Sequence, residues 1–539
     1  MKLRALGWLG TGLVVAIGGA QTAEAGGLTL PGPGAVATAR AGAAVASADD
    51  GEALAINPAG LAKSKGTTIT ISAALINYMM EFQRRGTYDA IDAEALPYEG
   101  QPYPLVKNDP DLPLGIGKFQ PVPVVAVVTD LGGAVPNLRL AAGIYAPNAY
   151  PFRDLCSVQS NGSCKKYTWN GDFNEPPPPA RYDVVRQDAA VVLPSIAASY
   201  RIIPQLDIGA RFSAGFGTIK SDVALWGNPG NVTEYVKEDA LFSAEATDNF
   251  VPAWGVGLSY RPSPSIEIAA AYNSQISVVA QGDARAEVGP AVGLNGIPIT
   301  IGASEVARCA PGGTMETQKV CVELALPMTA TLGGRYKFLG ADGTLRGDVE
   351  LNVGWENWSA ERADNYRVVV DGQIYVNGTP QLALKDTLIR HGFQDTYNVR
   401  AGGSYHVPVG GNKLIVRGGV GFDTAAAKKG WLRADIDGAA RTTATVGAGY
   451  RTKRWELNIG GGAILEGTQT NEGECNPTVS NVSMLGCNGD GDEREIDERE
   501  GPDPINPIVI PSQQIEAPVN KGTFKGTYVL FMLGFSTWF

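Results

Sequence analysis

Few side chains in this 539-residue sequence could carry out covalent chemistry or bind a metal. The chain has six cysteines and only two histidines, His391 and His406. A hydrolase needs a nucleophile beside a base, and no recognisable serine motif lies near either histidine. We therefore do not expect an enzyme, and we expect no cofactor.

The six cysteines fall into three local pairs along the sequence. Their spacing lacks the tight C-x-x-C form of zinc sites, and the chain has few histidines to complete such a site. Chains exported to an oxidising compartment form disulfides from pairs of this kind. We expect three disulfides and no metal site. The predicted disulfides are Cys156–Cys164, Cys309–Cys321 and Cys475–Cys487.

Alternating apolar and polar residues dominate the chain from about residue 67 onwards. In 348–356, for example, apolar side chains occupy the odd positions, and glycine or polar side chains the even ones. Side chains alternate between the two faces of a strand, so this segment has one apolar and one charged face. A soluble sandwich could explain one such strand. Charged faces on many strands, joined by connections that alternate between short and long, favour an outer-membrane barrel.

We predict an all-β fold, a transmembrane antiparallel barrel of about fourteen strands, in keeping with the even strand numbers of bacterial barrels. All three cysteine pairs then lie in or beside long loops on the outer side. The acidic stretch 490–500 is interpreted as a solvated loop, with cation binding as the alternative. The predicted strands are 67–82, 119–130, 137–149, 187–200, 204–220, 252–261, 264–280, 322–337, 345–359, 394–407, 412–423, 440–451, 453–468 and 523–539.

Both ends of the chain fit export to a bacterial outer membrane. Residues 1–25 have a basic start, a short apolar stretch and a small-x-small cleavage site, which predicts a signal peptide. The last strand ends on the aromatic Phe539, which resembles the signal that barrel-assembly machinery reads. The net charge of −11 argues against a nucleic-acid partner. We expect a monomer in contact with outer-membrane lipid and lipopolysaccharide.

Residues 26–66 lack the strand pattern and consist largely of small residues. A segment of this size could hardly fold alone, but a barrel lumen could supply its packing. Turn and capping residues gather near its end: Asp49, Asp50, Asn57, Pro58 and Ala59. We predict that this segment, called the hatch below, plugs a barrel formed by 67–539.

An ordered set of motifs resembles the FadL family of outer-membrane channels for long-chain fatty acids and other hydrophobic compounds. The set begins with Asp49-Asp50, six residues and Asn57-Pro58-Ala59, and continues at 250–260, 324–327, 355–359, 393–397 and 421–423. The resemblance implies capture of a hydrophobic ligand among the outer loops, a shift of the hatch, and lateral exit beside a kinked third strand. It does not select among fatty acids, aromatic hydrocarbons and terpenoids. An unplugged pore or a surface adhesin or receptor is the alternative.

Two groups of residues are candidates for steps of such transport. Tyr145-Ala146-Pro147 lies in the predicted third strand, where proline either kinks the strand or simply ends it. A ligand carboxylate would need a cation, and three arginines lie on predicted lumen faces. They are either carboxylate partners or members of a charge network in the wall with Asp207, Glu350 or Glu456. The three are Arg211, Arg417 and Arg451.

Overall fold

The computed structural model describes residues 29–471 and 522–539. Gaps in this description fall at 65, 91–94, 113–114, 170–172, 226–234, 292, 295–296, 385, 429–430 and 437. The predicted signal peptide, the Cys475–Cys487 pair and the acidic stretch 490–500 lie outside the described residues. None of the helices in the described part of the chain is long and apolar enough to cross a membrane.

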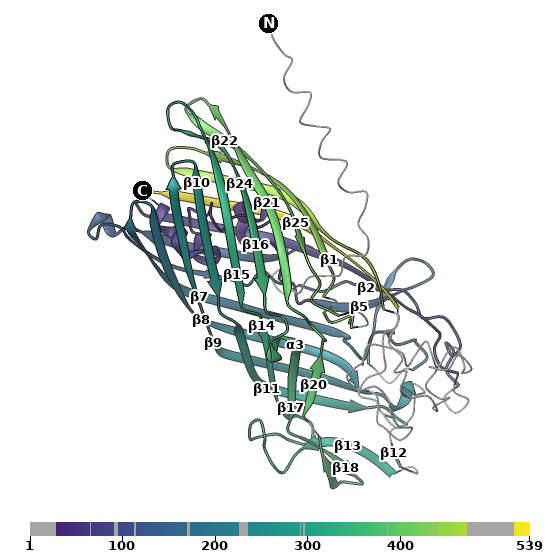
Figure 1. Cartoon of the computed structure of the whole chain (residues 1–539). Helices are drawn as coiled ribbons and strands as arrows, with labels where there is room; N and C mark the ends of the chain where they lie inside the picture. Colours follow the sequence, from purple (N-terminus) through teal and green to yellow (C-terminus); the bar gives the residue numbers. More distant parts are fainter. Residues whose placement is uncertain are drawn as a thin grey trace, which may run out of the picture.

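Fourteen antiparallel strands close into a barrel (Figure 1). The last strand pairs with the first along its whole length, from Thr68 opposite Trp538 to Arg84 opposite Gly522. The predicted fold class is therefore confirmed. In their order around the wall, the strands are β1 (Thr68–Arg84), β3 (Gln120–Thr129), β4 (Leu138–Tyr145), β7 (Arg186–Ile203), β8 (Leu206–Leu225), β9 (Ala240–Ser263), β10 (Ile266–Asn273), β15 (Thr329–Leu339), β16 (Leu345–Glu356), β21 (Thr396–Val409), β22 (Asn412–Asp423), β23 (Arg441–Arg451), β24 (Trp455–Asn471) and β25 (Gly522–Trp538).

The outward face of the wall carries exposed apolar side chains, as contact with lipid requires. Two aromatic bands border this face, which is typical of outer-membrane barrels. The band near the short turns contains Tyr200, Tyr260, Tyr336, Tyr405, Tyr450 and Trp455. The band nearer the long loops contains Trp254, Tyr272, Trp355 and Tyr397.

Further strands extend the wall beyond the long-loop side. They are β2 (Val106–Asn108), β5 (Arg153–Val158), β6 (Cys164–Lys166), β11 (Ile276–Val288), β14 (Gln318–Leu326), β17 (Asn365–Val370) and β20 (Thr387–Arg390). A separate four-stranded sheet lies at the far end (Figure 1) and contains β12 (Gly293–Leu294), β13 (Ile297–Ala303), β18 (Gly372–Val376) and β19 (Thr379–Ala383). Short helices in the connections are η2 (Leu131–Gly133), η3 (Val236–Glu238) and α3 (Glu361–Asp364).

Several predicted strands were wrong in extent: 137–149 ends at Tyr145, 252–261 is part of the longer β9, and two others each cover parts of two strands. The segment 264–280 is divided into β10 and β11, and 322–337 is divided between β14 and β15. The alternation of buried and exposed side chains changes phase across each division, so neither segment is one regular strand. Pro327 contributes to the second division because it has no backbone N–H.

Two of the predicted disulfides are present. Cys156–Cys164 joins β5 to β6, and Cys309–Cys321 joins the preceding loop to β14. Both lie beyond the barrel wall on the long-loop side, where each closes a local loop and restricts the unfolded chain.

The described part of the hatch, 29–64, lies inside the barrel, where its short helices appear as the purple coils enclosed by the wall in Figure 1. The helices are α1 (Gly34–Thr38), α2 (Ala53–Ile56) and η1 (Pro58–Lys63). Small residues suit this position because they allow the hatch backbone to approach the wall closely.

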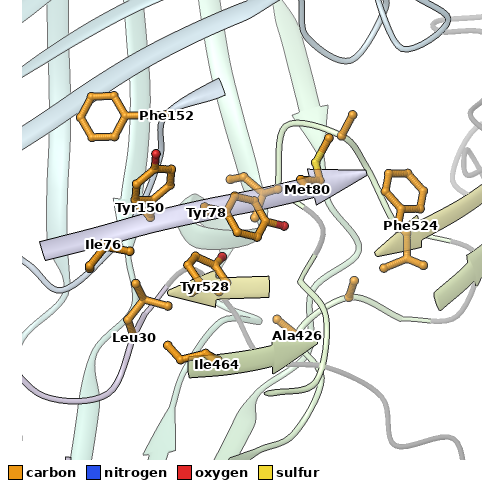
Figure 2. Packing of buried hydrophobic residues seen from close by; sticks show 14 of the residues in the cluster. Leu30, Ile76, Tyr78, Met80, Tyr150, Phe152, Ala426, Ile464, Phe524 and Tyr528 are labelled. Atoms are coloured by element: carbon orange, nitrogen blue, oxygen red, sulfur yellow. The ribbon is translucent and has the colours of Figure 1, made fainter. Parts of the chain in front are cut away.

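The inward face of the wall changes character along its height. On β1, Thr68, Thr70 and Ser72 face the hatch, whereas the next inward residues are apolar. The apolar set on β1 and β25 is Ile76, Tyr78, Met80, Phe82, Phe524, Tyr528, Leu530 and Met532. Figure 2 shows members of this set gathered with Leu30, Tyr150 and Phe152. The lumen is therefore polar at the level of the hatch and apolar on the extracellular side of it.

Candidate functional site: a plugged lumen with an apolar outer half

The Asn57-Pro58-Ala59 motif forms the start of η1. Asn57 Oδ1 accepts a hydrogen bond from Ala59 N at 3.1 Å, and Asn57 Nδ2 donates to Val45 O at 2.9 Å. Pro58 needs no backbone partner at this first helical position. The motif lies against Gly257 of β9, where a Cβ atom would stand 1.8 Å from Asn57 Oδ1. The hatch and a glycine of the wall thus fit only because that glycine has no side chain.

The two aspartates of the motif have different surroundings. Asp49 is exposed, whereas Asp50 accepts hydrogen bonds from Glu52 N at 3.0 Å and from Ser536 Oγ of β25 at 3.0 Å. Burial, together with the charges of Glu52 and Asp49, raises the pKa of Asp50 to about 8. Asp50 keeps some solvent contact, but it lies in the lumen among other carboxylates.

Glu52 organises the start of the hatch, although the sequence analysis did not identify it. Its carboxylate accepts hydrogen bonds from the backbone N–H groups of Ala35, Val36 and Ala37 at 2.7–3.1 Å, and from Ser72 Oγ at 2.7 Å. One carboxylate thereby joins α1, α2 and β1. Its spacing two residues after Asp50 was the only available signal.

Ion pairs also hold the hatch against the wall. Arg40 is 2% exposed, and it pairs with Asp348 at 2.9 Å and with Glu350 at 3.3 Å on β16. Lys63 pairs with Glu267 of β10 at 2.8 Å. Breaking a buried ion pair costs about 3–5 kcal/mol when one partner is removed. The hatch therefore rests in a docked position that particular charges stabilise.

Arg417 and Arg451 share one acidic partner. Arg417 Nη2 lies 2.6 Å from Glu456 Oε1, and Arg451 Nε pairs with the other oxygen of Glu456. Both arginines line a small polar cavity with Asp49, Asp50 and Glu52 of the hatch. Their charges are thus engaged at the contact between hatch and wall.

Arg211 has a different environment. It is 4% exposed, and its Nη atoms donate to Leu54 O at 2.8 Å and Asn273 Oδ1 at 2.9 Å. Its guanidinium lies 4.8 Å from the centre of the Tyr145 ring. Among the described residues no carboxylate forms an ion pair with Arg211, and its buried Nε has no hydrogen-bond partner. Of the three predicted arginines, this one alone keeps an uncompensated charge.

The third strand leaves the wall after Tyr145. The pairing of β4 with β7 ends at Tyr145 opposite Leu193, and pairing with β7 resumes only at Arg153 of β5, opposite Gln187. Residues 146–152 turn into the lumen instead, where Tyr150 is fully buried and Leu30 N donates to Asn148 O at 2.6 Å. Pro147 stands at this departure, and residues 188–192 of β7 have no strand partner on this side.

The comparison with family models assigns this architecture. Residues 16–464 match the model described as outer membrane protein transport protein (OMPP1/FadL/TodX). The chain belongs to this family. It is a FadL/TodX-family β-barrel of the outer membrane and a channel for hydrophobic compounds. The fold, the membrane and the family predicted from the sequence are confirmed.

Solved structures support the fold of this FadL/TodX-family channel at low sequence identity. A Pseudomonas aeruginosa FadL homologue aligns with a TM-score of 0.64 and 12% identity, over 95% of this chain and all of the homologue. The Ralstonia pickettii toluene transporter TbuX aligns with a TM-score of 0.57 and 14% identity, over 95% and 99%. The monoaromatic hydrocarbon channel CymD gives 0.55 and 12%, over 94% and 98%. No curated protein matches the chain.

The two histidines of this FadL/TodX-family channel lie in different regions. His391 is buried at the outer mouth, with Nε2 3.1 Å from Asp435 Oδ2 and Nδ1 3.1 Å from Asp364 O. It anchors the connection between β22 and β23, whose Trp431 joins the apolar set of the outer lumen. His406 lies near a short turn, with Nε2 3.1 Å from Ser404 Oγ. Its Nδ1 has no hydrogen-bond partner among the described residues.

Proposed function

We propose that this FadL/TodX-family channel takes up long-chain fatty acids and that Arg211 binds their carboxylate. The buried, uncompensated charge of Arg211 carries the proposal. A buried cation without a counter-ion costs several kcal/mol, so a chain that retains one gains from a ligand that neutralises it. A purely aromatic hydrocarbon offers no such charge.

The surroundings of Arg211 favour an acyl chain attached to that carboxylate. Tyr145, against which the guanidinium lies, belongs to an apolar cluster with Leu193 and Ala253 of the wall, and Ala55 of the hatch packs against it. Each methylene buried there contributes about 0.8 kcal/mol, so a long chain binds tightly without a large pocket. A water-filled pore would gain nothing from this apolar interior.

The test of the carboxylate site compares two ligands on two proteins. Arg211→Met keeps the length of the side chain and removes its charge. A charge-assisted hydrogen bond contributes about 1.5–3 kcal/mol, so fatty-acid affinity should fall by about 10- to 150-fold. The matched methyl ester should bind both proteins equally. Equal losses for acid and ester would show that the variant damaged the pocket, and no loss for the acid would refute the carboxylate role.

We also propose that the hatch, 26–66, gates passage through the barrel 67–539. The buried Arg40 and Glu52 contacts support this, because they hold a segment of small residues across the whole polar half of the lumen. Deleting 26–63 should abolish regulated uptake and raise the ion conductance of the barrel. Unchanged conductance together with unchanged fatty-acid uptake would exclude a gating role.

Lateral exit beside the third strand is the proposed last step. The inward turn of 146–152 supports it, because β7 residues 188–192 then face this side without strand hydrogen bonds. Pro147→Val would allow β4 to continue pairing along β7 and should slow release of the bound fatty acid. Ala444→Val, at an exposed position of β23 on another part of the wall, is the matched control. If both variants release ligand at the wild-type rate, Pro147 only ends a strand.

A further inference from the structure

A second interruption of the wall lies between β9 and the β10–β11 pair. The pairing of β9 with β10 ends at Gly255 opposite Asn273, and pairing with β11 begins at Thr247 opposite Gln281. Between these points, residues 248–254 and 274–280 form no regular ladder with each other, although the two ladders on either side are in the same register. On their other sides, residues within 248–254 pair with β8, and 276–280 pair with β14. We call these two segments the window.

Side-chain hydrogen bonds close the window at its ends. Asp248 Oδ2 accepts from Val279 N at 2.7 Å at the outer end. Ser274 Oγ accepts from Trp254 N at 2.9 Å at the inner end, where Ser274 N also donates to Trp254 O. Pro252 lies between the two ends and has no N–H to offer a ladder. Separating the two segments therefore breaks the Ser274 N–Trp254 O bond at the inner end, but no ladder pair joins 248–253 to 275–280.

The positions that face inward change from odd to even across the window. Ala269 and Ala271 of β10 face inward at odd positions, whereas Val278 and Ala280 of β11 face inward at even positions. On β9, the register with β8 shifts between Val251 and Asp248, which is a β-bulge. Bulges bend a strand and end regular pairing. Two neighbouring strands thus change phase at the same height, which makes the interruption a property of the wall.

The inner side of the window is apolar and continuous with the proposed ligand site. Val251 and Val278 belong to one buried cluster, and Ala253 belongs to the cluster that contains Tyr145. Ile276, in the window itself, packs against both clusters. Arg211 also reaches this place, because its Nη2 donates to Asn273 Oδ1 at the end of β10. A ligand bound beside Arg211 would therefore contact the window.

An apolar groove lies on the membrane side, directly below the inner end of the window. It has a volume of about 550 Å³, which is within the range of about 300–1,000 Å³ typical of small-molecule sites. Small outward side chains, Ala270 and Ala330, lie between larger ones such as Leu332 and Trp355. Tyr272 lines the groove and contacts Trp254 of the window, with ring centres 5.3 Å apart. The groove thus continues from the window along the lipid-facing wall.

We propose that the window is a second lateral portal for the transported hydrophobic compound and that the groove binds its apolar chain on the membrane side. The proposal rests on the proposed function, since it assumes the same cargo at the Arg211 site. Continuity between an apolar interior, an unpaired seam and an apolar groove identifies this cargo as the occupant. The inner end of the window lies at the long-loop aromatic band, where Trp254 contacts Tyr272, so the groove leads from the window onto the lipid-facing wall.

Photo-crosslinking tests the portal directly. Purified wild-type protein in lipid vesicles is loaded with a diazirine-labelled long-chain fatty acid, and a diazirine-labelled phospholipid is used in parallel. We expect fatty-acid label at Phe250, Trp254 and Leu332, and several-fold less at Val446 on the opposite lipid-facing wall. Equal fatty-acid label at Val446, or equal label of the groove by phospholipid, would overturn the proposal, because the groove would then be ordinary lipid contact.

Filling the groove tests its role in transport. Ala330→Trp occupies the groove, and Ala444→Trp places the same side chain on exposed wall of β23. If two portals act in parallel, blocking one should slow release of the fatty acid by about two-fold, so we expect this effect in Ala330→Trp. The double variant Ala330→Trp/Pro147→Val should release almost no fatty acid. The second portal would be overturned if Ala330→Trp released the fatty acid at the wild-type rate while Pro147→Val alone abolished release. Absence of fatty-acid binding in the wild type would instead refute the proposed function.

A second variant guards against a folding defect. Pro252→Val restores an N–H inside the window and should slow release in the same way without altering the groove. Heat-modifiable gel migration reports whether each barrel is closed. A folded Pro252→Val protein that releases fatty acid at the wild-type rate, alone and with Pro147→Val, would also overturn the portal.

Discussion

Replacing Arg40 by Met should loosen the hatch. Arg40 is the hatch residue that pairs with both Asp348 and Glu350 on β16. Asp348 keeps Arg335 as a partner after the change. Glu350 loses its only ion pair among the described residues and keeps the hydrogen bond from Ala46 N at 2.8 Å. The variant therefore leaves a buried carboxylate without a cation while the hatch is docked.

The size of the effect follows from this burial. Removing one partner of a buried pair costs about 3–5 kcal/mol. When the hatch leaves its position, water can reach Glu350, so the cost falls mainly on the docked state. Each 1.4 kcal/mol is a factor of ten, so the population of the undocked hatch should rise by about two to four orders of magnitude.

Single-channel conductance in planar bilayers measures this population. Arg40→Met should open often, whereas the wild type should remain closed. Glu350→Gln added to Arg40→Met removes the uncompensated charge and should restore part of the closed state. Arg433→Met, which alters an ion pair with Asp183 at the outer mouth, is the control and should stay closed. Equal conductance of wild type and Arg40→Met, with unchanged hydrogen exchange in the hatch, would refute the reasoning.

Two further predictions concern the fit and the charge of the hatch. Gly257→Ala places a methyl carbon 1.8 Å from Asn57 Oδ1, so it should displace the hatch and raise the conductance. Adding Asn57→Ala to this variant should lower the conductance again. Equal conductance of the wild type and both variants would contradict this fit. The raised pKa of Asp50, about 8, favours its protonated form when the hatch is docked. Docking should be strongest below about pH 4, the ordinary pKa of Asp, and weaken as the pH rises to about 8. In Asp50→Asn, the protection of the hatch amides against hydrogen exchange should depend less on pH than in the wild type. Stronger docking of the wild-type hatch at high pH than at low pH would contradict this prediction.

The barrel could be predicted because its constraint is local. A strand between lipid and lumen must alternate its side chains at every second residue, so a segment such as 348–356 reveals both faces by itself. The hatch could be predicted only as a segment without that pattern. Its central anchor, Arg40, pairs with a residue 308 positions away, and no local periodicity marks such a contact. Family resemblance located the Asn57 motif but gave no signal for Arg40.

Interruptions of the wall show where alternation misleads. Residues 264–280 read as one strand because apolar residues recur at short intervals throughout, yet inward positions are odd before Ser274 and even after Gln275. The number of strands can be predicted from alternation alone. The path of each strand in the wall also depends on whether its odd or its even positions face inward. A phase change within a strand reports a bulge or a break, and breaks on adjacent strands at one height report an opening in the sheet. The third strand has a proline at its departure from the wall, whereas the window depends on a reversal that only the paired strands make visible.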